Sequence, residues 1–187
     1  MSKITDQQIK EIAENNGIEY AALKAFIQVE TGGIGFNVDG KIIIQFEPHW
    51  FKRKAPYAPT GLWSVNKVDR QTAEWQAFNN AFSLNADAAM QSTSIGLGQI
   101  MGFHYKTLGY KTVGEMWDDA KRGEYQQVLQ IVRFLKSIPA LIKALQIKNW
   151  HLVATYYNGG GYKELAKKYG REPYNISLEK VYLKFKG

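Results

Sequence analysis

The chain has 187 residues, 45% of them hydrophobic and 22% charged, so it is long enough for one domain with a core and too short for two comfortable ones. It has no cysteine, which excludes disulfides and thiol nucleophiles, and no apolar run of about 20 residues that would predict a membrane-spanning helix. Its N-terminus lacks the apolar segment of a signal peptide, and its net charge is +7.

Most of the chain has helical patterns. Capping-box spacing at Thr5 and Gln8 opens a helix to about residue 15, and residues 20–30 are apolar almost all round, as in a buried helix. Later helices are expected at about 70–82, 87–91, 124–137, 149–158 and 174–185. Two more are expected to begin at the capping-box spacing of residues 112–115 and at Pro139.

One strand is expected between the early and the late helices. Asp39 and Gly40 suit a type I′ turn within residues 37–41, and residues 42–47 then alternate between two faces. Residues 48–67 are predicted as a loop rich in proline and aromatic residues. Since no repeat, linker or low-complexity segment interrupts the chain, we expect a single domain over 1–187 with an α+β, mostly α, architecture.

The helix predicted at 20–30 places a carboxyl group on its apolar side. Lys24 and Gln28 share one narrow stripe, whereas Glu30 lies on the other side, shortly before two glycines that end the helix. Burial and the negative end of the helix both disfavour ionisation, so the pKa of Glu30 should be raised. A glycosidase needs such a protonated general acid. The alternative is an ordinary glutamate paired with a nearby Lys or Arg.

Residues 94–99 have the character of a ligand-lining segment. Ser94 and the glycines that follow it let backbone approach a sugar closely, and the side chain of Gln99 offers both a donor and an acceptor. The alternative is a common loop before a helix that starts near Leu97.

Residues 156–161 combine aromatic rings, an amide and a run of glycines. Tyr157 would offer a flat face to a sugar and Asn158 a polar side chain, while the glycines end the helix. The alternative, core aromatics followed by a helix stop, is the preferred interpretation for Tyr156 only.

Together and in this order, these segments resemble the signature of goose-type lysozymes and soluble lytic transglycosylases: Glu-Thr-Gly-Gly at 30–33, Ser-Ile-Gly-Leu-Gly-Gln-Ile-Met at 94–101 and Tyr-Tyr-Asn-Gly at 156–159. Residues 43–51, Ile-Ile-Gln-Phe-Glu-Pro-His-Trp-Phe, narrow the resemblance to the N-acetylmuramidase family of phage endolysins, over nearly the whole chain. The resemblance implies a lysozyme-like fold in which a small hairpin or sheet forms one wall of the cleft. It also implies cleavage of the β-1,4 bond between N-acetylmuramic acid and N-acetylglucosamine in peptidoglycan, with Glu30 as the acid.

A second carboxylate is less clearly marked. Glu47, which faces opposite to Ile42, Ile44 and Phe46, is the first candidate for a base or a supporting charge, and Asp39 is the second, although turn chemistry already explains Asp39. Inversion would place the partner about 6.5–9.5 Å from the acid and retention about 5–5.5 Å. Several members of the superfamily work with one obligatory glutamate.

Other residues add a candidate sugar contact and no cofactor. Trp63 follows a loop and could stack on a sugar, whereas core packing is preferred for Trp75. The three histidines, His49, His104 and His151, lack metal-ligand spacing, so neither a metal nor another cofactor is expected.

The C-terminal part of the chain is basic. Residues 163–187 hold seven Lys or Arg and three Glu, a net +4. The simplest interpretation is a solvated basic face on a helix whose apolar stripe docks on the core. Anionic cell-envelope polymers are a further candidate partner, whereas nucleic acid is not expected to bind. The protein is expected to be a monomer.

The expected setting is a phage endolysin that a holin releases from the host cytoplasm to the cell wall. A secreted antibacterial effector is the alternative setting. The alternative activities are lytic transglycosylation with a 1,6-anhydro product and, from another class, a non-catalytic glycan- or nucleic-acid-binding module.

Overall fold

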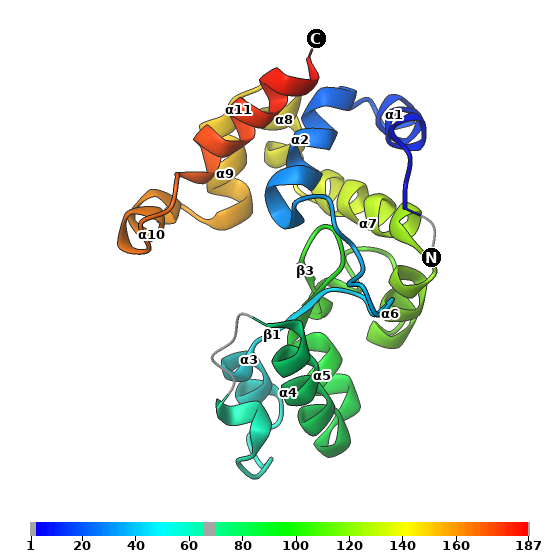
Figure 1. Cartoon of the computed structure of the whole chain (residues 1–187), viewed down its shortest axis with the longest axis vertical. Helices are drawn as coiled ribbons and strands as arrows, with labels where there is room; N and C mark the ends of the chain where they lie inside the picture. The colour runs from blue at the N-terminus through cyan, green and yellow to red at the C-terminus, as the bar shows by residue number, and fades with distance from the viewer. Residues whose placement is uncertain (1–2, 66–69, 187) are drawn as a thin grey trace. The chain divides into compact units, whose positions relative to one another are not determined.

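The computed structural model describes residues 3–65 and 70–186, which form a mostly helical protein with one small sheet (Figure 1). In chain order the elements are α1 (Asp6–Asn15), α2 (Tyr20–Thr31), β1 (Ile44–Phe46), α3 (Pro48–Lys54), the 3-10 helix η1 (Leu62–Val65), α4 (Gln71–Leu84), α5 (Ala86–Gln91), β2 (Thr93–Ile95), β3 (Ile100–Met101), the 3-10 helix η2 (Gly102–His104), α6 (Val113–Lys121), α7 (Glu124–Ser137), α8 (Pro139–Gln146), α9 (Trp150–Asn158), α10 (Tyr162–Lys168) and α11 (Tyr174–Phe185). Within the described ranges, none of the helices has the length and apolarity needed to cross a bilayer.

The described chain divides into two compact units. The first contains residues 34–65 and 70–130 together with Lys3, and the second contains residues 4–33 and 131–186. Each unit is therefore assembled from separate stretches of sequence, and α7 contributes residues to both. The expectation of a single domain over 1–187 stays a prediction.

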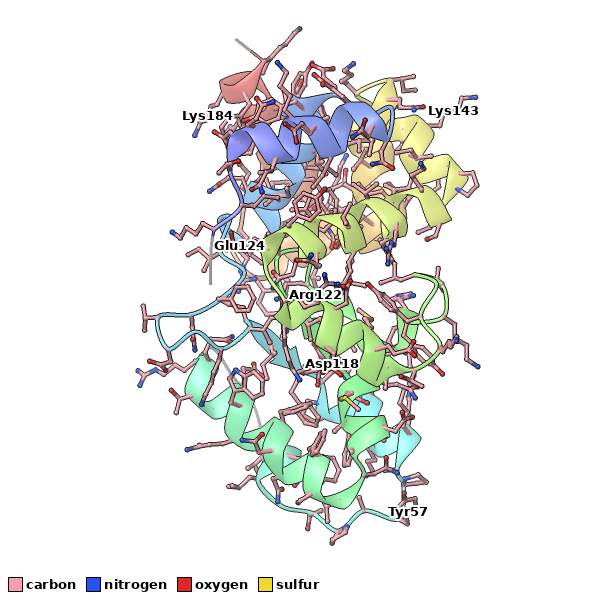
Figure 2. All side chains as sticks on the ribbon, turned by 90° about the vertical axis from the view of Figure 1, so that its right-hand side faces the viewer. Tyr57, Asp118, Arg122, Glu124, Lys143 and Lys184 are labelled. Carbon is pink, nitrogen blue, oxygen red and sulfur yellow. The ribbon has the colours of Figure 1, made fainter. Side chains whose placement is uncertain are left out.

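The first unit is built around an antiparallel sheet in the order β1-β2-β3. Ile44 pairs with Ile95 and Phe46 with Thr93, so the expected alternation along β1 is confirmed, with Ile44 and Phe46 buried and Gln45 exposed. Helix α4 lies along β1, and its Glu74 carboxylate accepts the Phe46 N–H at 2.8 Å. Glu124, which is labelled in Figure 2, lies at the start of α7, and its carboxylate accepts the Gly35 N–H at 3.2 Å.

The second unit is helical, and its C-terminal helix is part of its core. Helix α11 runs along α2 and also contacts α9, as Figure 1 shows. Leu178 and Tyr182 of α11 are buried, as are Leu23 and Phe26 of α2. The prediction that the last helix docks through an apolar stripe is therefore confirmed.

Several helix ends follow the capping signals in the sequence. At α1 the Thr5 side chain accepts from the Gln8 N–H while the Gln8 side chain accepts from the Thr5 N–H, which completes the capping box. Thr112 accepts from the N–H of Glu115 at the start of α6, and α7 has the predicted bounds.

Two local predictions are wrong. The turn at 37–41 is not type I′, because only Gly40 has positive φ there and Asp39 does not. The Asn37 side chain accepts from the N–H groups of Asp39 and Lys41, and this bonding sets a different turn. The loop expected at 48–67 contains α3 and η1, because Pro48 suits the first turn of a helix; residues 66 and 67 lie outside the described chain.

The alternative of a helix starting near Leu97 is also contradicted. Residues 96–99 form a turn between β2 and β3, held by a bond from the Gln99 N–H to the Gly96 carbonyl at 3.2 Å. Helix α10 was not predicted.

Candidate active site

Glu30 occupies the last turn of α2 in the second unit. The helix ends because Gly32 adopts a left-handed conformation with φ 64° and donates its N–H to the Gln28 carbonyl. Glu30 keeps part of its surface exposed, but its carboxyl is enclosed by protein, and this burial raises its pKa from 4.5 to about 7. The phenol of Tyr174 donates a hydrogen bond to Oε1, which lowers the pKa and only partly offsets burial. Near neutral pH a large share of Glu30 is therefore protonated.

Aromatic rings from α2, α9 and α11 surround this carboxyl group. The Tyr157 ring stacks on Tyr174 with centroids 6.1 Å apart and meets Phe26 edge-on at 4.6 Å. It also packs edge-on against Phe134 at 5.7 Å. Burial, followed by the negative charge of Glu30, raises the pKa of Tyr157 and of Tyr174 well above 10, so both phenols stay neutral.

Tyr174 is the residue at this site that sequence reasoning missed. The sequence indicates only that Tyr174 begins the helix expected over 174–185. Since 144 residues separate it from Glu30, no local pattern links the two side chains.

A hollow of about 480 Å³ adjoins the acid in the same unit. Its lining includes Tyr174, Asn158 and Val29, which precedes Glu30, together with residues of α10. Asn158 is exposed there at the end of α9. The preference for Tyr156 as a core residue is wrong, since it is 42% exposed. The helix turns Tyr157 inward instead, toward Phe26.

Glu47 belongs to the first unit and stands at the start of α3. Its N–H donates to the Ser92 carbonyl at 2.9 Å, which fixes the backbone. Its carboxylate accepts from the Gln45 amide at 3.1 Å and lies 3.4 Å from Nδ1 of His49. Burial raises the pKa of Glu47, although the charge of His49 and the Gln45 bond oppose that rise.

Ser94 and Gln99 lie together in the same unit. Ser94 is buried, pairs with Gln45 across the sheet, and donates its hydroxyl to Oε1 of Gln99 at 3.0 Å. The Gln99 amide donates to the Gly96 carbonyl at 2.9 Å. Gln99 also has a left-handed backbone with φ 45°, an uncommon conformation for a residue with a side chain. These two bonds hold its amide group at one position in the turn.

The side chain of Gln127, in α7, holds the turn at 96–99 through hydrogen bonds. Its Oε1 accepts the Leu97 N–H at 2.9 Å and its Nε2 donates to the Ala120 carbonyl at 3.0 Å. A Cβ added at Gly96 would lie 2.7 Å from the Gln127 side chain, so glycine is needed at this close approach. Sequence reasoning missed Gln127, which looks like an ordinary polar residue of a long helix.

Trp63 is misassigned by the sequence prediction. It is only 3% exposed, packs against Phe51 at 4.9 Å and donates its indole N–H to the Pro59 carbonyl at 2.8 Å. It is therefore a core residue of the first unit and has no face free for a sugar. The core placement of Trp75 is supported by its edge-on contacts with Phe78 and Trp117.

The second candidate carboxylate, Asp39, lies exposed in the turn at 37–41. Across residues 3–65 and 70–186, no group of three or more His, Asp or Glu side chains has an arrangement that could hold a metal ion.

A mostly helical chain with a small antiparallel sheet, and with a glutamic acid kept largely neutral at a helix end, has the features of a lysozyme-like glycoside hydrolase. The N-acetylmuramidase family model matches residues 19–186, and the chain belongs to this family. The chain is thus a glycoside hydrolase of peptidoglycan, as the motifs predicted.

The solved structures include a similar protein. The crystal structure of the Burkholderia AP3 phage endolysin matches with a TM-score of 0.81 and 30% sequence identity, over 98% of this chain and 70% of the endolysin chain. This match confirms the predicted fold class. No curated protein sequence gives a significant match.

Proposed function

We propose that this muramidase is a phage endolysin and that Glu30 is its general acid. In this proposal Glu30 protonates the glycosidic oxygen between N-acetylmuramic acid and N-acetylglucosamine as the bond breaks through an oxocarbenium-like state. Water then completes the hydrolysis and leaves a reducing N-acetylmuramic acid.

The observation that carries the proposal is the burial of the Glu30 carboxyl group beside the Tyr174 phenol, which raises its pKa to about 7. A carboxyl group with an ordinary pKa would be almost fully ionised at neutral pH and would have no proton to give. The Tyr174 hydrogen bond fixes the orientation of the carboxyl group and also stabilises the carboxylate that remains after proton transfer.

The other candidate residues receive supporting roles. Glu47, whose pKa is also raised, assists the attacking water or the developing positive charge. Gln99, anchored by Ser94, and the exposed Asn158 position the sugars, while Tyr157, packed on Tyr174, holds the aromatic surroundings of the acid in place. For Ser94 the role is indirect, because its hydroxyl is already donated to Gln99.

The proposed setting is the wall of the host bacterium. A holin would release the protein from the cytoplasm, and it would act as a monomer. Its basic C-terminal face would attract anionic envelope polymers, and the exposed Lys184 of α11, labelled in Figure 2, belongs to that face.

The test is mass spectrometry of fragments released from purified peptidoglycan by the wild type and by Glu30→Gln. The wild type is expected to release fragments that end in reducing N-acetylmuramic acid. The variant is expected to release none, although its circular dichroism spectrum remains that of the folded protein. Fragments lighter by one water would mean transglycosylation, and full activity of a folded Glu30→Gln protein would refute the role of the acid.

A further inference from the structure

The hollow beside Glu30 combines an apolar wall with hydroxyl and charged side chains, which is more than a sugar alone would need. Sugars present hydroxyl groups in many directions and need several side-chain donors and acceptors. Yet much of its wall is apolar, formed by Val29, Leu165 and Ala166 together with tyrosine rings. Among its lining residues only Asn158 carries a side-chain amide.

One cation on this wall has no acidic partner. Within the described part of the chain, no carboxylate lies within ion-pair distance of Arg171, whose guanidinium lies 5.7 Å over the Tyr169 ring. The neighbouring Glu172 is not available to it, because its carboxylate accepts from Lys180 and from the Ser177 hydroxyl. The carboxylate in the lining of the hollow, Glu172, is already paired with Lys180, so the hollow offers apolar surface together with the positive charge of Arg171, which can form new bonds.

The position of the hollow limits what can enter it. Tyr174 belongs to its lining and also donates to Glu30, so a ligand in the hollow lies beside the bond being cleaved. In peptidoglycan, N-acetylmuramic acid carries a short peptide on its lactyl group. This stem begins with the methyl side chain of alanine and continues with a glutamate that retains a free carboxylate.

We propose that this hollow binds the peptide stem of the muramic acid whose bond is cleaved, with Arg171 on the stem carboxylate and Leu165 against its methyl groups. The inference rests on the proposed function, since it places the stem relative to Glu30. An arginine fork matches a carboxylate, and the aliphatic wall matches the small side chains of the stem. The enzyme thus recognises stem-bearing muramic acid and not the glycan alone.

The experiment compares two substrates: intact peptidoglycan whose stem glutamate is free, and the same glycan strands freed of their peptides by an N-acetylmuramoyl-L-alanine amidase. The measured quantity is the ratio of kcat/KM on intact to kcat/KM on stripped strands, from the release of reducing ends. Losing a hydrogen-bonded charge pair should lower this ratio about tenfold in Arg171→Gln. Leu165→Ser should lower it less, and because Leu165 is 55% exposed the core should be kept.

Lys167→Gln is the matched control, since it removes the same charge from α10 at an exposed position outside the lining of the hollow. Its ratio should equal that of the wild type. An unchanged ratio in Arg171→Gln, or an equal loss on both substrates, would overturn the inference. Failure of the proposed function has a different signature: no reducing ends from the wild type on either substrate, or full activity of Glu30→Gln.

Discussion

Replacing Glu30 with Gln removes the titrating group, keeps its size and leaves an oxygen that can accept the Tyr174 phenol. Because the pKa of Glu30 is raised from 4.5 to about 7, the unfolded chain loses this proton before the folded chain does. Below pH 4.5 the group is protonated in both states and contributes nothing. As the pH rises from 4.5 to 7, the folded state becomes progressively less stable relative to the unfolded one, and the penalty is complete above pH 7.

The size of the effect follows from the two pKa values. Between pH 5 and pH 8 the penalty grows by about 2.5 kcal/mol. Glu30→Gln lacks it, so the stability of the variant relative to the wild type should increase by this amount over the same interval. For a chain of this length that corresponds to a change of about 5–10 °C in the difference between the two melting temperatures.

The assay is thermal and urea unfolding of both proteins at pH 5 and pH 8, with Glu14→Gln as the matched control, since Glu14 lies exposed on α1. Taking the difference between variant and wild type removes the contribution of every other titrating group. If the difference does not change between pH 5 and pH 8, the carboxyl group of Glu30 is not desolvated, and the argument for its role as an acid at neutral pH fails.

Three further changes test other parts of the structure. Tyr174→Phe removes a bond that lowers the pKa of Glu30, so the alkaline limb of the pH profile of kcat/KM should move to higher pH, and a limb that stays in place would contradict the contact. Gln127→Ala removes two buried bonds beneath residues 96–99 and should cost about 1–3 kcal/mol in urea unfolding together with a higher KM; wild-type stability would refute that support. Deleting residues 174–187 removes buried core residues and should abolish cooperative thermal unfolding seen by circular dichroism; a folded truncated protein with weaker binding to anionic vesicles would instead favour a surface role for this helix.

The helices were predictable because their signals are local. The capping box at Thr5 and the apolar stripe of the last helix depend on residues three or four positions apart, and the structure contains both. The position of Glu30 on the apolar side of its helix could likewise be read from spacing. The pKa shift followed from that placement, and burial is indeed its main cause.

The surroundings of the site could not be predicted in this way. The contacts of Tyr174 with Glu30 and of Gln127 with Leu97 join residues far apart in sequence, and either residue is ordinary in its own segment. The prediction that Trp63 contacts a sugar was wrong for a related reason. A tryptophan in a loop looks available, but its burial depends on Phe51 and on the Pro59 carbonyl that accepts its N–H.

The left-handed backbone at Gln99 has a consequence for evolution and engineering of the enzyme. A side chain in this conformation costs about 1 kcal/mol, and the bonds with Ser94 and Gly96 offset that strain. Glycine would adopt the same backbone without strain but would carry no amide group. Because both bonds would be lost together with the strain, glycine at position 99 would gain little stability, and if Gln99 positions the sugars as proposed it would also cost activity.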